Sequence, residues 1–92
     1  MHPAAIGPSV VLVRRADEEN YRSARLIDLG LTPRQAETAV ALARTGGTNT
    51  QLARSLVIAE GTVKKHLEAV FRTLGVDSRA AAVAVLQQMT TR

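Results

Sequence analysis

The sequence predicts an all-α fold: a bundle of four helices, preceded by an additional N-terminal helix and a short strand-like or disordered tail. Apolar residues recur at helical spacing in several segments, and threonine or serine residues suited to cap a helix precede most of these segments. The only aromatic residues are Tyr21 and Phe71, so the core must consist of aliphatic side chains and alanine. Such a core favours closely packed helices over a sheet sandwich.

The length and composition set limits on the fold and the location. The chain has 92 residues, enough for one small domain, and no cysteine, which excludes a disulfide framework and a cysteine-based zinc site. No apolar run approaches the roughly 20 residues of a membrane span, and Met1 to Val13 lacks the charged start of a signal peptide. We therefore expect a soluble, cytoplasmic protein without a membrane segment.

The first segments are the hardest to interpret. Met1 to Pro8 contains two prolines and a glycine and is predicted to be disordered. Ser9 to Arg15 is rich in β-branched residues and is predicted to form a strand. Such a lone strand could pair with a second copy of the chain, be the last strand of an upstream domain, or be an unstructured tail.

A connector helix is predicted from Asp17 to Leu29. Acidic residues occupy its expected first turn, where the helix dipole favours them. Tyr21, Ala24 and Ile27 follow at near-helical spacing, and Gly30 provides a stop.

The net charge of +4 is unevenly distributed between two parts of the chain. Residues 1–30 are neutral overall, whereas residues 31–92 carry eight basic and four acidic side chains. We assign residues 1–30 to a tail and connector helix, interpreted as the remnant or linker of a missing sensor domain, and residues 31–92 to the functional domain. An excess of positive charge in one domain is weak support for nucleic-acid binding.

Two capping boxes introduce the next two helices. Thr32 is followed by Pro33 at the first helical position and by Gln35 three residues after the cap, which predicts a helix from Pro33 to about Arg44. Thr48 and Gln51 repeat the pattern and predict a short helix that ends near Ser55. A brief turn then leads into the next helix, as in a helix-turn-helix.

The helix from about 60 to 74 is amphipathic. Its apolar stripe and its charged face lie on opposite sides when neighbouring residues are turned by about 100°. The stripe consists of Val63, Leu67, Val70 and Leu74, and the opposite face of Gly61, Lys64, Lys65, Glu68 and Arg72. We interpret it as a DNA recognition helix with its apolar side against the core.

The last helix is predicted from Arg79 to about Thr90. Gly75 ends the preceding helix, and Asp77 or Ser78 can cap the new one. Its expected core face consists of Ala82, Val83, Leu86 and Met89. The alanine-rich, weakly charged remainder could cover the bundle or contact a symmetric partner.

Three strings in these helices resemble the LuxR-type (GerE-like) helix-turn-helix domain of bacterial transcription regulators. They are LTPRQAE, NTQLARSLVIAEGTVKKHL and LGVDSRAAAVAVL, and the resemblance covers about residues 31–86. It implies four helices, sequence-specific binding of double-stranded DNA by the third, and a homodimer formed largely through the fourth. RNA polymerase is a further candidate partner, and no cofactor is implied.

The resemblance also implies roles for individual residues. Lys64, Lys65 and Glu68 occupy positions that reach base edges, where lysine can donate to guanine and glutamate can accept from cytosine. The expected phosphate contacts are Thr62, His66, Arg72, Asn49 and Arg34. The expected dimer interface comprises Ala81, Val85 and Gln88. Alternatives remain for two of the expected DNA contacts: Glu68 could simply pair with Lys64, and His66 could be a packing residue.

The sequence departs from the family pattern at the start of two helices. Ala59 stands where a serine or threonine usually caps the recognition helix, and Gln51 replaces the acid of a capping box. In addition, Ala81 replaces a common acid in the last helix. A hydroxyl at position 59 would satisfy a backbone N–H that alanine leaves free.

An enzyme is not expected. Outside the tail the chain has one histidine, and it has no paired carboxylates in an apolar setting and no glycine-rich phosphate loop, so catalytic and metal-binding residues are not predicted. Three hypotheses remain: the output domain of a LuxR-family regulator, a sigma-factor region 4-like promoter-binding domain, and a helix-turn-helix protein-interaction module without DNA binding. The TVKKH and LGVDSR strings favour the first.

Overall fold

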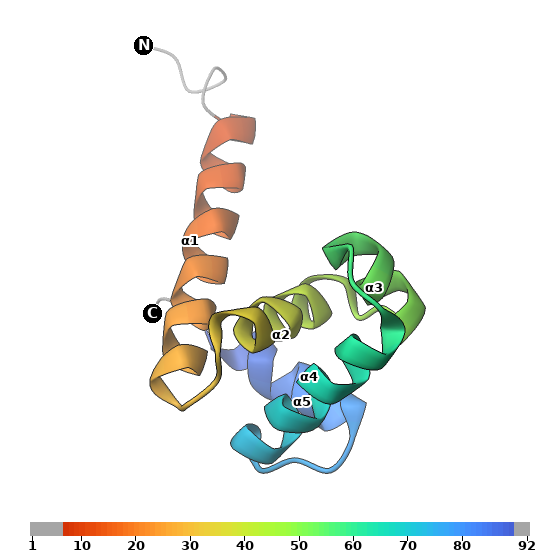
Figure 1. The fold of residues 1–92 in the computed structure, drawn as a ribbon. Helices are drawn as coiled ribbons and strands as arrows, with labels where there is room; N and C mark the ends of the chain where they lie inside the picture. The colour runs from red at the N-terminus through yellow and green to blue at the C-terminus, as the bar shows by residue number, and fades with distance from the viewer. Residues whose placement is uncertain (1–6, 90–92) are drawn as a thin grey trace.

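The protein is all-helical in a computed structural model that describes residues 7–89, with side chains from residue 17 onward. Its five helices are α1 (Gly7–Asp28), α2 (Pro33–Thr45), α3 (Asn49–Leu56), α4 (Glu60–Leu74) and α5 (Arg79–Gln88). Figure 1 shows α2 to α5 gathered into a bundle, with the N-terminal part of α1 standing clear of it. The predicted all-α fold with an additional N-terminal helix is therefore confirmed.

The predicted strand from Ser9 to Arg15 is wrong, because this segment lies inside α1. An isolated strand would leave its backbone N–H and C=O groups without protein partners, whereas a helix pairs them within the segment. Gly7 and Pro8, predicted to be disordered, form the start of α1, where the missing N–H of proline costs nothing. The rest of the predicted tail, residues 1–6, lies outside the described residues.

The connector helix exists, but its start and its inward face differ from the prediction. Because α1 begins at Gly7, the acids that follow Ala16 are not in its first turn. The expected stripe faces outward: Tyr21 is 37% and Ile27 41% exposed, whereas Leu26 is fully buried. Arg22 shares the inward side, with its Nε donating to the Leu86 carbonyl oxygen of α5 at 2.9 Å. The spacing of apolar residues alone does not determine which side of α1 faces inward, because contacts with the other helices determine it.

Helix α2 is the centre of the bundle and packs against each of the other four helices. Its expected apolar positions are all buried: Ala36, Ala39, Val40, Leu42 and Ala43. Thr38 and Ala41 are buried as well, so little of the helix faces solvent. The many small side chains let the neighbouring helices approach closely.

The predicted helix boundaries follow from the caps. The side chains of Thr32 and Thr48 accept from the backbone N–H three residues later, and both capping boxes are complete. Ser78 is the residue that caps α5. Gly75 ends α4 in the left-handed conformation, with φ 71°. Helix α5 ends at Gln88, and the predicted end at Thr90 lies outside the described residues.

The core joins the inner faces of all five helices. In α4 the buried residues are Val63, Leu67 and Val70, and Leu74 packs partly buried against them. In α5 they are Ala82 and Leu86, with Val83 and Met89 partly buried. These are the faces that the sequence predicts. In the described part of the chain, no helix is long and apolar enough to cross a membrane.

Candidate nucleic-acid interface

Helices α3 and α4 form a helix-turn-helix. Helix α3 ends at Leu56, and the next residue, Val57, adopts a left-handed conformation (φ 58°) and is 87% exposed. The N–H of the following residue, Ile58, donates back to the Ala53 carbonyl oxygen of α3 at 3.0 Å. The Ile58 side chain packs against the core and thereby fixes the direction in which α4 leaves the turn.

Helix α4 begins with a cap that lacks a hydrogen-bonding side chain. Ala59 has the extended backbone of an N-cap, and its side chain makes no capping hydrogen bond. Its carbonyl oxygen accepts from the N–H groups of Thr62 at 3.0 Å and Val63 at 3.1 Å. The Thr62 side chain is exposed beside this first turn, as a phosphate contact would require.

The three predicted base-contacting residues lie on the outer surface of α4. Lys64, Lys65 and Glu68 are exposed, while Val63 and Leu67 anchor the opposite side in the core. Ion pairs in the described part of the chain join Arg34 to Glu37 and Arg44 to Glu19, and none includes these three residues. The alternative, an ion pair between Lys64 and Glu68, is therefore not present, and all three charged groups remain available.

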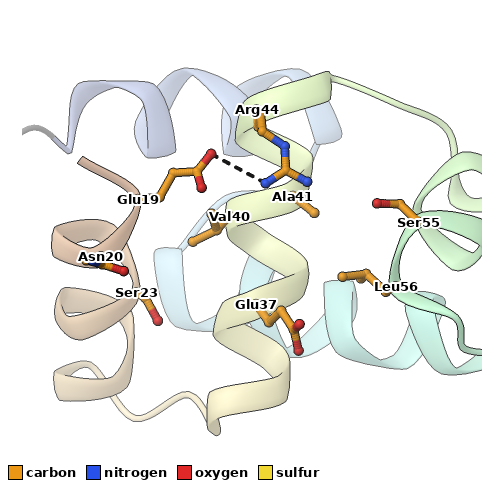
Figure 2. A pocket seen from close by; sticks show the side chains of 9 residues that line it. All are labelled: Glu19, Asn20, Ser23, Glu37, Val40, Ala41, Arg44, Ser55 and Leu56. Atoms are coloured by element: carbon orange, nitrogen blue, oxygen red, sulfur yellow. Dashed lines mark hydrogen bonds and ion pairs between the residues drawn. The ribbon is translucent and has the colours of Figure 1, made fainter. Parts of the chain in front are cut away.

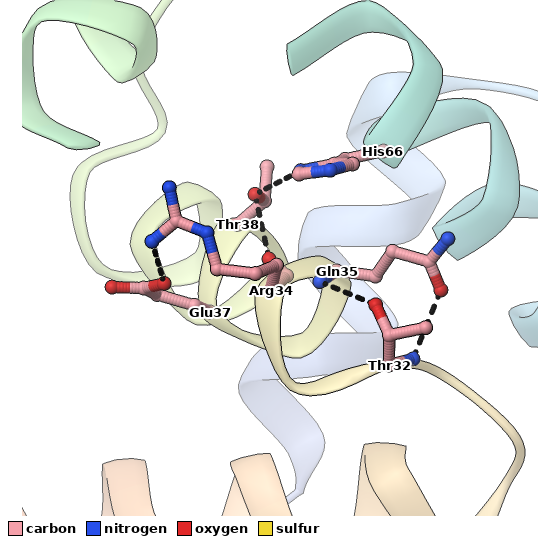
Figure 3. Close-up of polar contacts among 6 residues, drawn as sticks. All are labelled: Thr32, Arg34, Gln35, Glu37, Thr38 and His66. Atoms are coloured by element: carbon pink, nitrogen blue, oxygen red, sulfur yellow. Dashed lines mark hydrogen bonds and ion pairs between the residues drawn. The ribbon is translucent and has the colours of Figure 1, made fainter. Parts of the chain in front are cut away.

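His66 lies at the edge of this surface and connects α4 to α2 (Figure 3). Its Nδ1 is 3.0 Å from Oγ1 of the buried Thr38. The Thr38 hydroxyl donates its one hydrogen to the Arg34 carbonyl oxygen at 3.0 Å, so it must accept from Nδ1–H of His66. The Nδ1 atom of His66 thus has a partner inside the domain, while Nε2 carries no hydrogen bond within the described residues.

The other predicted phosphate contacts have protein partners or lie further along α4. Arg34 pairs with Glu37 on the same helix at 2.7 Å, with both side chains about half exposed (55% and 50%). Such an exposed pair contributes little and leaves Arg34 able to change partner. Asn49 accepts from Arg79 at 2.8 Å, and Arg72 is exposed in the last turn of α4.

The predicted dimer residues lie on α5, away from its core face. Gln88 is exposed, and Ala81 and Val85 are partly exposed, whereas Ala82 and Leu86 are buried. The three predicted residues therefore remain accessible in the single chain.

A separate cavity of about 350 Å³ lies between α1, α2 and α3 (Figure 2). Its lining mixes carboxylates, hydroxyls and aliphatic groups, and Arg44 crosses it to reach Glu19 at 3.4 Å. No residue of α4 lines it. The cavity is thus distinct from the exposed surface of the helix-turn-helix. In the part of the chain with described side chains, no group of three or more acidic or histidine residues could hold a metal ion.

Three polar residues that organise this structure were missed by the sequence reasoning. Thr38 anchors His66, Arg79 contacts the α2–α3 loop, and Arg22 joins α1 to α5. Only Thr38 has a local indicator, since a hydroxyl stands among the apolar positions of α2. The two arginines contact residues far away in the sequence, for which local periodicity contains no information.

The compact helical bundle, the turn between α3 and α4 and the exposed charged face of α4 define a helix-turn-helix domain. Residues 29–86 match the family described as bacterial regulatory proteins, luxR family. The chain belongs to this family, which confirms the resemblance and favours it over the sigma-factor alternative.

Several curated proteins are similar to this chain. It is 42% identical over 65 residues to the CsgBAC operon transcriptional regulatory protein of Escherichia coli K12, covering 71% of this chain and 30% of that protein. It is 47% identical over 55 residues to the probable transcriptional regulatory protein SgaR of Hyphomicrobium methylovorum, covering 60% and 26%. The chain thus spans less than a third of these relatives. No solved structure matches it significantly.

Proposed function

We propose that this chain is the DNA-binding output domain of a bacterial transcription regulator and that α4 enters the major groove. The observation that carries the proposal is the division of α4 into a buried side and an exposed side with Lys64, Lys65 and Glu68. The LuxR family match and the relatives named as transcriptional regulators support it. The matched part is less than a third of the length of these relatives, so the proposal concerns DNA binding by this domain alone.

The exposed side chains of α4 suit a preference for G·C base pairs. A lysine ammonium can donate to O6 and N7 of guanine, and a glutamate can accept from N4 of cytosine. Because Lys64 and Glu68 are one turn apart, they would read neighbouring base pairs. Lys65 projects beside them and extends the contact along the groove.

Phosphate contacts would surround this central group. Thr62 offers a hydroxyl at the start of α4, and Arg72 offers a charge at its end. His66 lies beside them, held to α2 by the contact between its Nδ1 and Thr38. Asn49 and Arg34 complete the set from the first turns of α3 and α2. These groups would fix the orientation of the domain without reading sequence.

A homodimer on a two-part operator completes the proposal. Ala81, Val85 and Gln88 would form an isologous contact, in which the same surface of α5 serves both subunits. Half-sites would then lie about one helical turn apart, or a multiple of it. RNA polymerase is a second proposed partner, as the target of a regulator bound at a promoter.

The test is a titration with a random-sequence duplex at low and moderate salt. We expect binding that weakens as salt rises, because neutralised phosphates release counterions. A double variant with Lys64→Ala and Lys65→Ala should bind at least tenfold more weakly. The charge-matched control is Arg25→Gln with Arg44→Gln, which removes two positive charges outside α4.

The control separates a specific surface from general attraction. Equal losses in both double variants would mean that net charge, not the α4 surface, drives the binding. A folded chain that binds no duplex at low salt would contradict the proposal and favour a helix-turn-helix module that contacts protein instead.

A further inference from the structure

Arg79, the first residue of α5, contacts the start of the helix-turn-helix. One guanidinium nitrogen donates to Oδ1 of Asn49 at 2.8 Å, and the other donates to the Gly47 carbonyl oxygen. Asn49 is the first residue of α3, and Gly47 lies in the loop before it. Residues about 30 positions apart in sequence are thereby held together.

Local helix stability does not explain an arginine at this position. A positive charge in the first turn of a helix opposes the helix dipole. In the described part of the chain, no carboxylate lies within ion-pair distance of Arg79. Its partners are therefore the neutral oxygen atoms of Asn49 and Gly47, and its structural role is the contact between α5 and the start of α3.

This contact fixes the orientation of the Asn49 amide. A guanidinium group can only donate hydrogen bonds, so Oδ1 must face Arg79 and the Nδ2 amino group must point the other way. Within the described residues Nδ2 has no protein partner, and no side-chain nitrogen or oxygen is buried without one. The two N–H donors of the Asn49 amide therefore remain unpaired at the start of α3 and are not buried.

We propose that Arg79 is a positioning residue for DNA binding, which holds Asn49 so that Nδ2 donates to a phosphate oxygen. The inference rests on the proposed function and deepens it, because it explains how a neutral side chain is committed to contact an anion. Without Arg79 the amide is free to rotate about its last torsion, and its oxygen can face the phosphate and repel it.

The deciding variant is Asn49→Asp. An aspartate keeps an oxygen acceptor for Arg79, gains an ion pair with it, and suits the first turn of α3. The thermal midpoint should therefore stay equal to that of the wild type or rise. The outward amino group becomes a carboxylate oxygen, so Kd for a duplex at low salt should rise about tenfold or more.

A double-mutant cycle tests the coupling. Asn49→Ala and Arg79→Gln should each raise Kd about tenfold relative to the wild type. If the two residues act together, the double variant should also raise Kd only about tenfold, whereas independent residues would give about a hundredfold. Because Arg79 also holds Gly47, Arg79→Gln could lower the thermal midpoint. The comparison of Asn49→Asp with Asn49→Ala still decides the question if that variant does not fold.

Three results would overturn the inference. Wild-type affinity in Asn49→Asp would show that Nδ2 contacts no phosphate, and additive losses in the cycle would show that Arg79 acts independently. A decrease of about 0.9 in the salt slope of Arg79→Gln would identify a direct phosphate contact by Arg79 itself. Lys64→Ala serves as the reference variant. If it weakens DNA binding while the Asn49 variants do not, only the inference about Arg79 and Asn49 fails. If the wild-type protein does not bind DNA, the proposed function itself is refuted.

Discussion

The missing side-chain cap at the start of α4 leads to a quantitative prediction: Ala59→Ser should stabilise the domain. The backbone of Ala59 (φ −72°, ψ 150°) closely matches that of Thr32 (φ −72°, ψ 161°), whose hydroxyl caps α2. In α2 this hydroxyl lies 3.1 Å from the nitrogen atom of Gln35. A serine at position 59 can therefore reach the Thr62 nitrogen without any movement of the backbone.

The magnitude follows from what the Thr62 N–H already does. A serine cap contributes about 0.5–2 kcal/mol relative to alanine. Here the N–H already donates to the Ala59 carbonyl oxygen at 3.0 Å, so the new hydroxyl would share it. We therefore expect the lower half of the range, about 0.5–1 kcal/mol, or an increase of about 3–6 °C in the midpoint of thermal unfolding.

Urea unfolding, followed by circular dichroism, measures this free energy. The midpoint should increase while the slope stays the same, because the surface exposed on unfolding does not change. The matched control is the isosteric pair Ala59→Thr and Ala59→Val, which differ by the oxygen atom that accepts the hydrogen bond. An equal effect of threonine and valine, or an unchanged midpoint in Ala59→Ser, would refute capping as the mechanism and the assigned start of α4.

Three further substitutions test other parts of the structure. Val57→Asn should stabilise the domain by about 1 kcal/mol in thermal unfolding, since an exposed β-branched residue with positive φ is strained there; a loss of stability would contradict that strain. Thr38→Val should cost about 1–2 kcal/mol in urea unfolding, because it removes the hydrogen bond between Thr38 and His66 and the one from Thr38 to the Arg34 carbonyl; an unchanged stability would mean that water replaces them. Leu26→Ala should cost about 2–5 kcal/mol in the same assay, because Leu26 is fully buried; a much smaller loss would show that α1 is not part of the folded core.

The sequence predicts those features that depend on neighbouring residues. Thr32 and Thr48 each stand before a helix with glutamine at the matching position, and both capping boxes occur as predicted. The buried side and the exposed side of α4 are predicted for the same reason, since the two faces follow from the helical period alone. The sequence also predicts that Ala59 is an N-cap without a hydrogen-bonding side chain, which the structure confirms.

The errors occur where distant contacts decide the outcome. The β-branched run that starts at Ser9 favours a strand locally, but a strand needs a partner and this segment is helical. The inward face of α1 is set by Leu26 and Arg22, which contact other helices, and not by the apolar spacing of Tyr21 and Ile27.

In the candidate site, too, the features set by the local pattern could be predicted, and those set by distant contacts could not. The exposure of Lys64, Lys65 and Glu68 follows from the pattern of α4, and the structure places all three together. Their roles in binding remain predictions. The orientation of Asn49 could not be predicted, because it depends on a guanidinium group about 30 residues away.

The central position of α2 has a consequence for the dynamics of the domain. Every residue from Thr38 to Ala43 is buried, and each of the other helices packs on this one. Its amide hydrogens can therefore reach solvent only when the whole bundle opens, so they should exchange with deuterium at the rate set by global unfolding. The amides in the first half of α1, which stands clear of the bundle in Figure 1, should exchange by local fraying. We therefore expect the slowest exchange in α2, the helix that packs against both α3 and α4.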